Sequence, residues 1–343
     1  MTTGVLLVNL GTPDAPRPRE VRRYLAEFLS DPRVLDMNPI GRWLLLHGVI
    51  LRTRPRASAA AYAKVWTEAG SPLLVHSLAL RDGVREALGD GYRVELGMRY
   101  GNPSIESGLD ALVEAGVSRI LAWPLFPQYA EAATGSAVAR IEEILAKRRN
   151  PPPLRLLGDF YEAPGFIRAF ADLARPALEA FRPDHVLLSY HGLPERQVRA
   201  LDPTGSHCLA SDDCCDAIGP ANARCYRAHC FATTRALRAA LDLSPERSSL
   251  SFQSRLGRTP WIRPFTDEVL PELAAQGVKR LAVLCPAFVA DCLETLEEIG
   301  IRAREQWHEL GGEELCLVPC PNAHPTWVAA VADTVRAAQG TAA

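Results

Sequence analysis

The chain has 343 residues, of which 48% are hydrophobic and 23% charged, and its formal net charge is −2. This composition is typical of a water-soluble globular protein, and the small net charge excludes the basic surface on which nucleic-acid binding depends. A single hydrophobic core rarely grows beyond about 250–300 residues, so we expect two lobes.

The N-terminus leads directly into an apolar strand at residues 5–10. It has neither the basic region nor the small-residue cleavage site of a signal peptide, and no apolar run reaches the roughly 18 residues that span a bilayer. We therefore expect a cytoplasmic protein, with association at a membrane surface as an open alternative. The sequence leaves the oligomeric state open.

Residues 38–56 join an apolar stretch around Trp43 to three arginines, Arg52, Arg54 and Arg56. Two interpretations have equal weight. The segment is either a hydrophobic lip that touches a membrane or covers an apolar ligand, or a core helix followed by a solvated basic turn.

Strand-like apolar runs alternate with amphipathic helical segments along the chain. The runs lie at residues 5–10, 94–98, 120–125, 186–190, 250–253, 281–284 and 315–318. This alternation predicts an α/β fold with mostly parallel sheets flanked by helices.

Two pairs of segments resemble each other in the same order, which predicts two similar Rossmann-like lobes with an active-site cleft between them. Residues 5–13 resemble 186–194, and residues 115–122 resemble 276–283. The proline-rich stretch at 150–153 marks the predicted boundary, so the lobes are residues 1–150 and 151–343.

His191 follows the apolar run 186–190 and precedes Gly192 and Pro194, which end the strand. Ligands bind at the carboxyl ends of parallel strands, and an imidazole titrates near neutral pH. Taken alone, such a histidine is more often inert than catalytic.

Three carboxylates, Asp291, Glu294 and Glu298, follow the run 281–284 at spacings that place them on one face of an α-helix. Their repulsion needs a cation or protons to compensate, so the stripe could pass a hydrated metal inward or share protons with a base. On spacing alone, a solvated acidic face near a helix N-terminus is the favoured alternative.

Taken together, these motifs resemble those of the ferrochelatases, which insert ferrous iron into a porphyrin. The resemblance covers nearly the whole chain and rests on the joint order of short motifs. They are residues 4–13, 28–31, 70–72, 98–101, 126–129, 134–136, 189–194, 252–255, 260–261 and 287–296. The resemblance implies Fe²⁺ as substrate and the conversion of protoporphyrin IX to protohaem, the last step of haem biosynthesis.

By this resemblance, His191 is the family's pocket histidine and Glu294 the glutamate that faces it. Asp291 and Glu298 correspond to acidic residues on the metal's route. His191 would accept a pyrrole proton or present a lone pair to iron, with Glu294 as its counterpart, and the sequence does not decide between these roles.

The same resemblance places five further residues on the porphyrin or its propionates, although an ordinary packing role is an equal alternative for each. They are Arg99, Tyr100, Tyr129, Ser136 and Trp261. Family branches that act on coproporphyrin have a tyrosine directly after Gly-Thr-Pro. That place is Asp14 here, which favours protoporphyrin IX.

Five of the nine cysteines lie in an insert at about 205–230. They are Cys208, Cys214, Cys215, Cys225 and Cys230. Their spacing matches neither the ferredoxin patterns nor paired zinc knuckles. The other four, Cys285, Cys292, Cys316 and Cys320, have the apolar surroundings of ordinary core residues.

Some bacterial ferrochelatases are similar in carrying a [2Fe–2S] cluster on an internal segment. The resemblance therefore implies this cofactor on four of the five clustered cysteines: Cys208, Cys225, Cys230 and one of Cys214 and Cys215. Structural zinc with help from His207 or His229 is one alternative, and free thiols are another.

Two rival functions stay open. A cobalt or nickel chelatase for a related tetrapyrrole would carry a similar acidic stripe. A non-catalytic tetrapyrrole or Fe–S carrier would use the fold for binding alone.

Overall fold

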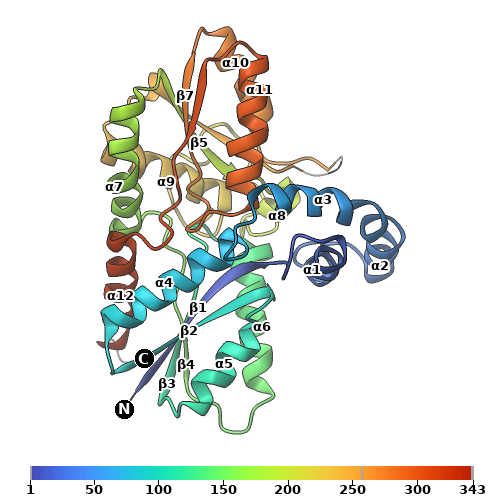
Figure 1. The fold of residues 1–343 in the computed structure, drawn as a ribbon, viewed down its shortest axis with the longest axis vertical. Coiled ribbons are helices and arrows are strands. Elements are labelled where there is room, and N and C mark those ends of the chain that lie inside the picture. The colour runs from blue at the N-terminus through green and yellow to red at the C-terminus, as the bar shows by residue number, and fades with distance from the viewer. Residues whose placement is uncertain (1, 256, 258, 341–343) are drawn as a thin grey trace. The chain divides into compact units, whose positions relative to one another are not determined.

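The structure is a computed structural model that describes residues 2–255, 257 and 259–340, and the chain divides into two compact units (Figure 1). The first unit comprises Met1–Phe126, Glu131–Asp159 and Asn322–Ala343. The second comprises Pro127–Ala130 and Phe160–Pro321. In the described part of the chain, no helix is long and apolar enough to cross a membrane.

The first unit is built on a parallel sheet with the strand order β2-β1-β3-β4. Its strands are β1 (Thr3–Thr12), β2 (Tyr92–Gly101), β3 (Arg119–Pro124) and β4 (Leu154–Leu156). The central strand β1 is almost entirely buried, as its continuous apolar run predicts for a parallel strand covered on both faces.

Helices cover both faces of this sheet (Figure 1). Leu6 and Val8 of β1 pack against α5 (Ile105–Glu114) and α6 (Ser136–Ala146). On the other face, the amide of Asn9 donates to the Ser77 hydroxyl on α4 (Pro72–Leu88) at 3.2 Å. The chain's last helix, α12 (Pro325–Gly340), packs on α4.

Side chains of β3 and β4 are among those that tie α12 to the first sheet. The rings of Trp123 on β3 and Trp327 on α12 have centroids 6.3 Å apart. Arg155 on β4 donates to the main-chain oxygen of Ala338 at 2.6 Å. The observed units therefore differ from the predicted division at 150, because β4 pairs with β3 and α12 returns to the first sheet.

The N-terminal unit also contains α1 (Pro18–Ser30), α2 (Pro39–Leu45), η1 (Leu46–Ile50) and α3 (Leu51–Val65). Leu46 and Leu51 pack with Leu29 of α1 in a small apolar cluster. The predicted segment 38–56 is thus three consecutive helical pieces, of which η1 is a π-helix.

The second unit repeats the same topology with the strand order β6-β5-β7-β8. Its strands are β5 (His185–His191), β6 (Ser248–Gln253), β7 (Arg280–Leu284) and β8 (Glu314–Leu317), all parallel. The two parallel sheets flanked by helices confirm the predicted fold class.

One face of the second sheet packs against α10 (Thr266–Ala275), the π-helix η4 (Glu294–Ala303) and α11 (Arg304–Glu309). The other face carries α9 (Tyr226–Leu241), where the Thr234 hydroxyl lies 2.9 Å from that of Tyr190, and α7 (Pro164–Phe181) packs on α9. Side chains alternate across a strand, and Leu187 faces α10 and η4, so His191 leaves β5 toward that same face.

Shorter helical pieces complete the structure. They are η2 (Glu131–Gly135) in the first unit, and α8 (Glu195–Arg199) and η3 (Pro245–Arg247) in the second.

Candidate active site

His191 is the last residue of β5 and is half-buried. Its Nδ1 lies 2.6 Å from the main-chain oxygen of Gly192. Since a carbonyl oxygen only accepts, Nδ1 carries the proton in this contact, and Nε2 of the neutral ring carries the lone pair. The Tyr226 hydroxyl donates to the main-chain oxygen of His191 at 2.8 Å, so the ring and the main chain are both held.

Gly192 permits close packing directly beside this histidine. A Cβ at position 192 would lie 2.9 Å from the main-chain oxygen of Gln253 and 3.2 Å from Cε3 of Trp261. The Phe288 ring meets the imidazole edge-on, with centroids 6.4 Å apart. The structure therefore brings Trp261, a predicted porphyrin residue, into the immediate surroundings of His191.

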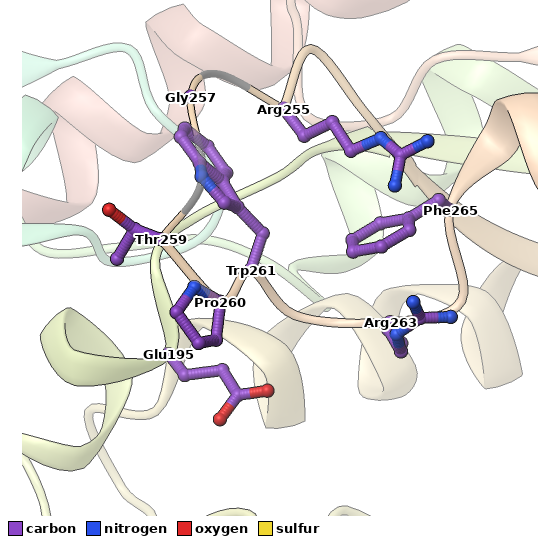
Figure 2. Close-up of a pocket in the computed structure, with 8 residues that line it drawn as sticks. All are labelled: Glu195, Arg255, Gly257, Thr259, Pro260, Trp261, Arg263 and Phe265. Atoms are coloured by element: carbon purple, nitrogen blue, oxygen red, sulfur yellow. The ribbon is translucent and has the colours of Figure 1, made fainter.

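Trp261 also lines a pocket of about 270 Å³ (Figure 2). The other lining residues are Glu195, Arg255, Gly257, Thr259, Pro260, Arg263 and Phe265. The guanidinium groups of Arg255 and Arg263 each lie 4.3 Å from the centroid of the Phe265 ring. Arg255 pairs with Asp267 and Glu268, and Arg263 pairs with Glu268, so two carboxylates balance the two guanidinium charges. The pocket therefore combines the Trp261 and Phe265 rings with charged side chains.

Gln253, the last residue of β6, connects the ends of three chain segments. Its Oε1 accepts from the Ser189 hydroxyl on β5 at 2.8 Å, and its Nε2 donates to the main-chain oxygen of Glu294 at 2.7 Å. Its own main-chain oxygen accepts from the amide of Gly192 at 2.8 Å. The buried Gln253 amide thus relates the strand that ends at His191 to the helix that begins at Glu294.

Asp291 lies before η4 rather than on it, and only 5% of it is exposed. Its Oδ1 accepts from the Thr295 hydroxyl at 3.1 Å and from the amide of Cys320 at 3.3 Å. The carboxylate is therefore held by polar donors inside the unit instead of lying on an exposed acidic face.

Glu294 is the first residue of η4 and is half-buried. Burial raises the pKa of the neighbouring Cys292 thiol, and the charge and hydrogen bonding of Glu294 raise it further. Cys292 therefore stays a protonated thiol that donates to the Glu294 carboxylate.

Glu298 lies one turn further along the same π-helix and holds the end of β6. Its carboxylate accepts from the Ser254 amide at 2.8 Å and from the Ser254 hydroxyl at 2.5 Å. Ser254 has a φ of 68°, in the left-handed region that serine rarely occupies, so these two bonds stabilise an otherwise unfavourable backbone. The predicted single α-helical stripe is thus replaced by a buried aspartate and two glutamates on a π-helix.

Three further predicted residues meet in the first unit around Asp31, a buried carboxylate at the end of α1. Asp31 Oδ2 accepts from Arg99 Nη2 at 2.6 Å, from the Tyr100 hydroxyl at 3.0 Å and from the Ser136 hydroxyl at 2.5 Å. Arg99 Nε also donates to Ser136 Oγ at 2.7 Å. The side chains of Arg99, Tyr100 and Ser136 are therefore engaged with one another, and Tyr100 is completely buried.

The electrostatics of this cluster favour an ionised Asp31. Burial alone would raise the pKa of the carboxyl group, but hydrogen bonds from Ser136, the Arg33 amide and Tyr100, with the Arg99 charge, outweigh it and lower the pKa. Burial is also the main reason why the pKa of the Tyr100 phenol is raised, so the phenol remains a donor.

Tyr129 lies in the short segment Pro127–Ala130 of the second unit and is buried. Its amide donates to Nδ1 of His229 at 3.2 Å, and the Arg224 guanidinium lies 4.1 Å from its ring centroid. The structure thus places Tyr129 beside the insert's C-terminal part.

Comparison with known proteins decides the family. The ferrochelatase family model matches residues 2–339. The ferrochelatase of Coxiella burnetii (strain Dugway 5J108-111) is 49% identical over 97% of this chain and 93% of its own length. That of Azotobacter vinelandii (strain DJ / ATCC BAA-1303) is 50% identical over 97% of this chain and 98% of its own. The chain belongs to the ferrochelatase family.

This membership confirms the predicted enzyme class, a ferrochelatase of haem synthesis that inserts iron into a porphyrin. The ferrochelatase of Legionella pneumophila (strain Lens) agrees, at 48% identity over 98% of this chain and 99% of its own. The solved structure of SirB from Bacillus subtilis with Fe³⁺ shares the fold, with a TM-score of 0.55 at 15% identity, covering 98% of this chain and 95% of that one.

The five insert cysteines of this ferrochelatase are all buried. The Cys214 and Cys215 sulfurs are 3.7 Å apart, and Arg227 Nη1 lies 3.2 Å from the Cys215 sulfur. The Cys225 thiol is hydrogen-bonded to those of Cys208 and Cys215, and the Cys225 contact is the main reason why the pKa of Cys215 is raised.

These contacts test whether the insert fits the predicted cluster. Soft donors gather in one buried region, as a [2Fe–2S] centre requires. They do so as thiols in hydrogen-bond contact, and within the described residues no three His, Cys, Asp or Glu side chains are arranged to hold a metal ion. The cysteine side chains are therefore of the type that a [2Fe–2S] cluster needs. To bind it, the thiols would have to ionise and change their positions.

An exposed apolar surface lies on α2 and η1. Ile40 is 75% exposed and Trp43 60%, and Met37, Leu44 and Val49 are exposed beside them. We call these five residues the α2 patch. The nearby Arg52, Arg54 and Arg56 are exposed too. Burial in a core, the alternative considered for this segment, does not hold for these side chains.

Sequence reasoning did not assign roles to Asp31 in the first unit, or to Tyr226, Gln253 and Ser254, which bond to the segments around His191 and Glu294 in the second. Asp31, Gln253 and Ser254 lie inside the motifs that carry the family resemblance, so their position was the available signal. Tyr226 had no signal beyond its place next to Cys225.

Proposed function

We propose that this ferrochelatase inserts Fe²⁺ into protoporphyrin IX and that His191 and Glu294 handle the pyrrole protons and the metal. The observation that carries this proposal is the bonding of Gln253, which links the end of β5 to the start of η4 within one unit. The imidazole and the carboxylate therefore have a common, rigid frame, as acid–base partners need.

Metallation removes two pyrrole N–H protons and places Fe²⁺ on the four nitrogens. With Nδ1 directed at the Gly192 carbonyl, His191 offers Nε2 as a proton acceptor or an iron ligand. The Glu294 carboxylate takes the other proton or replaces water on the entering iron.

We propose that Asp291 and Glu298 lie on the route of iron to Glu294. Both lie near Glu294 in the chain, and both carboxylates already accept hydrogen bonds that a cation would compete for. Oxygen ligands of this kind suit a hydrated divalent metal ion better than thiols do.

Porphyrin recognition is assigned to Trp261 and Tyr129, with Arg99, Tyr100 and Ser136 in support. The packing of Trp261 on Gly192 favours direct contact with the flat ring. The shared bonding to Asp31 indicates that Arg99, Tyr100 and Ser136 act by holding the end of α1 against β2 and α6.

Protoporphyrin IX is the favoured substrate because of Asp14. Its carboxylate is exposed, accepts from the Asn102 amide at 2.9 Å and pairs with Arg23. Family branches that act on coproporphyrin have a tyrosine at this place, so Asp14 favours protoporphyrin IX.

The decisive assay follows haem formation anaerobically from protoporphyrin IX and Fe²⁺. His191→Ala and Glu294→Ala should each lower kcat by about 10²–10⁴-fold, the usual weight of an acid–base group. His185→Gln, at the opposite end of the same strand, is the matched control and should keep full activity. Haem formation by neither wild type nor variants, with porphyrin binding intact, would favour a carrier. Turnover only with Co²⁺ or Ni²⁺ on another tetrapyrrole would favour the other chelatases.

We further propose that the insert holds a [2Fe–2S] cluster on Cys208, Cys225, Cys230 and one of Cys214 and Cys215. The burial of all five thiols supports this, and Arg227 beside Cys215 can balance the negative charge of thiolate ligands. A zinc site that includes His229 is disfavoured, because both ring nitrogens of His229 already have main-chain hydrogen-bond partners. Aerobically purified protein should be coloured, and a colourless protein with stoichiometric zinc would contradict the cluster.

We also propose that the α2 patch touches a membrane surface reversibly. Exposed apolar side chains next to arginines are typical of segments that lie in the interface of anionic bilayers. Ile40→Ser/Trp43→Ser should reduce sedimentation with anionic vesicles, whereas Val113→Ser, at an exposed apolar residue elsewhere, should not. Equal sedimentation of all three proteins would contradict the proposal.

A further inference from the structure

The first turn of α9 contacts both the cysteine insert and His191. Cys225 is the residue before the helix, and Tyr226 is its first residue. The Tyr226 hydroxyl donates to the main-chain oxygen of His191 at 2.8 Å. The next residue, Arg227, places Nη1 3.2 Å from the sulfur of Cys215.

The surroundings of Tyr226 leave its hydroxyl little freedom. The side chain is only 6% exposed, and its hydroxyl is also a neighbour of the Cys230 thiol one turn along the helix. A single peptide bond joins Tyr226 to Cys225. The Cys225 thiol is hydrogen-bonded to the thiols of Cys208 and Cys215. Any displacement of Cys225 is therefore carried to Tyr226 through covalent geometry.

A displacement of Tyr226 reaches the imidazole by one further step. The hydroxyl fixes the peptide that follows His191, and the ring's own Nδ1 bonds to the carbonyl oxygen of the next peptide, at Gly192. Further along α9, Thr234 is bonded to Tyr190 at 2.9 Å, which anchors the rest of the helix to β5. The first turn is thus the part of α9 that contacts His191 directly.

We propose that Tyr226 is a positioning residue through which the state of the insert cysteines sets the orientation of His191. The inference rests on the proposed function for its effect on catalysis, and it assigns the insert a role in controlling iron insertion. Metal binding, oxidation or substitution at the cysteines would each act through the same hydroxyl–carbonyl bond.

Tyr226→Phe removes only the hydroxyl and is the first test. We expect kcat to fall about tenfold with an unchanged KM for porphyrin, because a small misplacement of a catalytic group is costly. Tyr190→Phe is the matched control, since it makes the same change in the adjacent buried tyrosine and also removes an α9–β5 bond. It should lower the melting temperature and leave kcat unchanged. Equal losses of kcat in the two variants would overturn the proposal.

The coupling to the cysteines is tested by a double-mutant cycle. Cys225→Ser should lower kcat in the wild-type background and have little further effect in Tyr226→Phe. Cys215→Ser serves the same purpose if Cys225→Ser does not fold. Losses that simply multiply would show that the insert acts on catalysis by another route.

A measurement without turnover separates this inference from the proposed function. In porphyrin-free protein labelled with ¹⁵N-histidine, Cys225→Ser and Tyr226→Phe should both shift the His191 ring resonances, which His191→Gln identifies. This shift is expected even if the assay yields no haem. Unchanged resonances in both variants would overturn the coupling while leaving the assignment of His191 intact.

Discussion

Asp31 is the single residue that holds together three of the predicted porphyrin residues. Its carboxylate is 2% exposed and lies 2.6 Å from the Arg99 guanidinium. Removing one partner of such a buried pair is more destabilising than removing both, because it leaves an uncompensated charge.

We predict that Asp31→Asn lowers the free energy of unfolding at pH 7 by about 3 kcal/mol, by analogy with other broken buried pairs. The pKa of Asp31 is lowered in the folded protein, so its contribution is present above its unfolded value and is lost as the pH falls through the folded one. Urea unfolding between pH 7 and pH 3 measures both effects. Asp110→Asn, which breaks an exposed pair with Arg148, should cost at most about 1 kcal/mol and is the control.

A second pH effect is expected from His185. Here the folded protein favours the neutral form of a base, whereas at Asp31 it favours the charged form of an acid. Burial, with the charges of Arg238 and Arg247, lowers the pKa of the imidazole, so the folded protein favours the neutral ring. The resulting stability is fully present above the unfolded pKa of about 6.5 and decreases below it, because the unfolded chain then binds the proton first.

His185→Gln should therefore gain stability relative to wild type as the pH falls from 7.5 to 5. The glutamine amide can still bond to Ser249, which lies 2.8 Å from His185 Nε2. Melting temperatures across this range provide the measurement. Two curves that run parallel would contradict the assignment of a neutral, buried ring.

At the scale of single residues, the sequence prediction worked where a local pattern marks a residue. It failed where a residue's role depends on partners far away along the chain. The positions of His191 and Glu294 after strands β5 and β7 could be predicted from the apolar runs that precede them, while their roles stay predictions. Asp31 lies in a helix end and becomes important only through Arg99 and Ser136, and no local pattern announces such contacts.

At the scale of elements, the ends of β5 and β6 meet where Gly192 packs on Trp261. We predict that Gly192→Ala lowers porphyrin affinity and kcat together and destabilises the protein by about 1–3 kcal/mol, as overpacking usually does. The new methyl group would meet the main chain of Gln253, which cannot move without disturbing the strand pair. Porphyrin fluorescence titration and the haem assay measure the two effects.

Gly158→Ala is the control for this substitution, because a Cβ there meets nothing within 4 Å. Its affinity, kcat and stability should match those of the wild type. Unaltered porphyrin binding in Gly192→Ala would show that Trp261 does not contribute to the ring's site.

The sequence predicted the strands well, but it did not predict that the helix carrying Glu294 and Glu298 is a π-helix. Continuous apolar runs identify buried parallel strands directly. The π-helix η4 differs from an α-helix in the span of its main-chain hydrogen bonds, and side-chain periodicity over one or two turns does not distinguish the two. The predicted common face of Asp291, Glu294 and Glu298 therefore rested on the wrong helical geometry.

At the scale of the whole molecule, α12 is part of the first unit although it is last in sequence. We predict that ending the chain after residue 321 leaves the second unit folded and destabilises the first, because the Trp123–Trp327 contact and the bond from Arg155 are lost. Limited proteolysis should then cleave within residues 72–159 and spare 160–321. Uniform resistance across both units would contradict this prediction.

The return of α12 is also the feature of the architecture that the sequence did not predict. An amphipathic helix indicates that one of its faces is buried, but it does not indicate which of two similar sheets it covers. The predicted division at 150 followed the nearest proline-rich stretch, whereas β4 and α12 extend the first unit beyond it.

This chain order has a consequence for biosynthesis. Domains usually fold during translation in the order in which they leave the ribosome. Here the N-terminal unit lacks α12 until the last residues emerge, whereas the second unit is complete once residue 321 is free. We therefore expect the later-made unit to mature first, and the surface of α4 on which α12 packs to stay uncovered until α12 emerges.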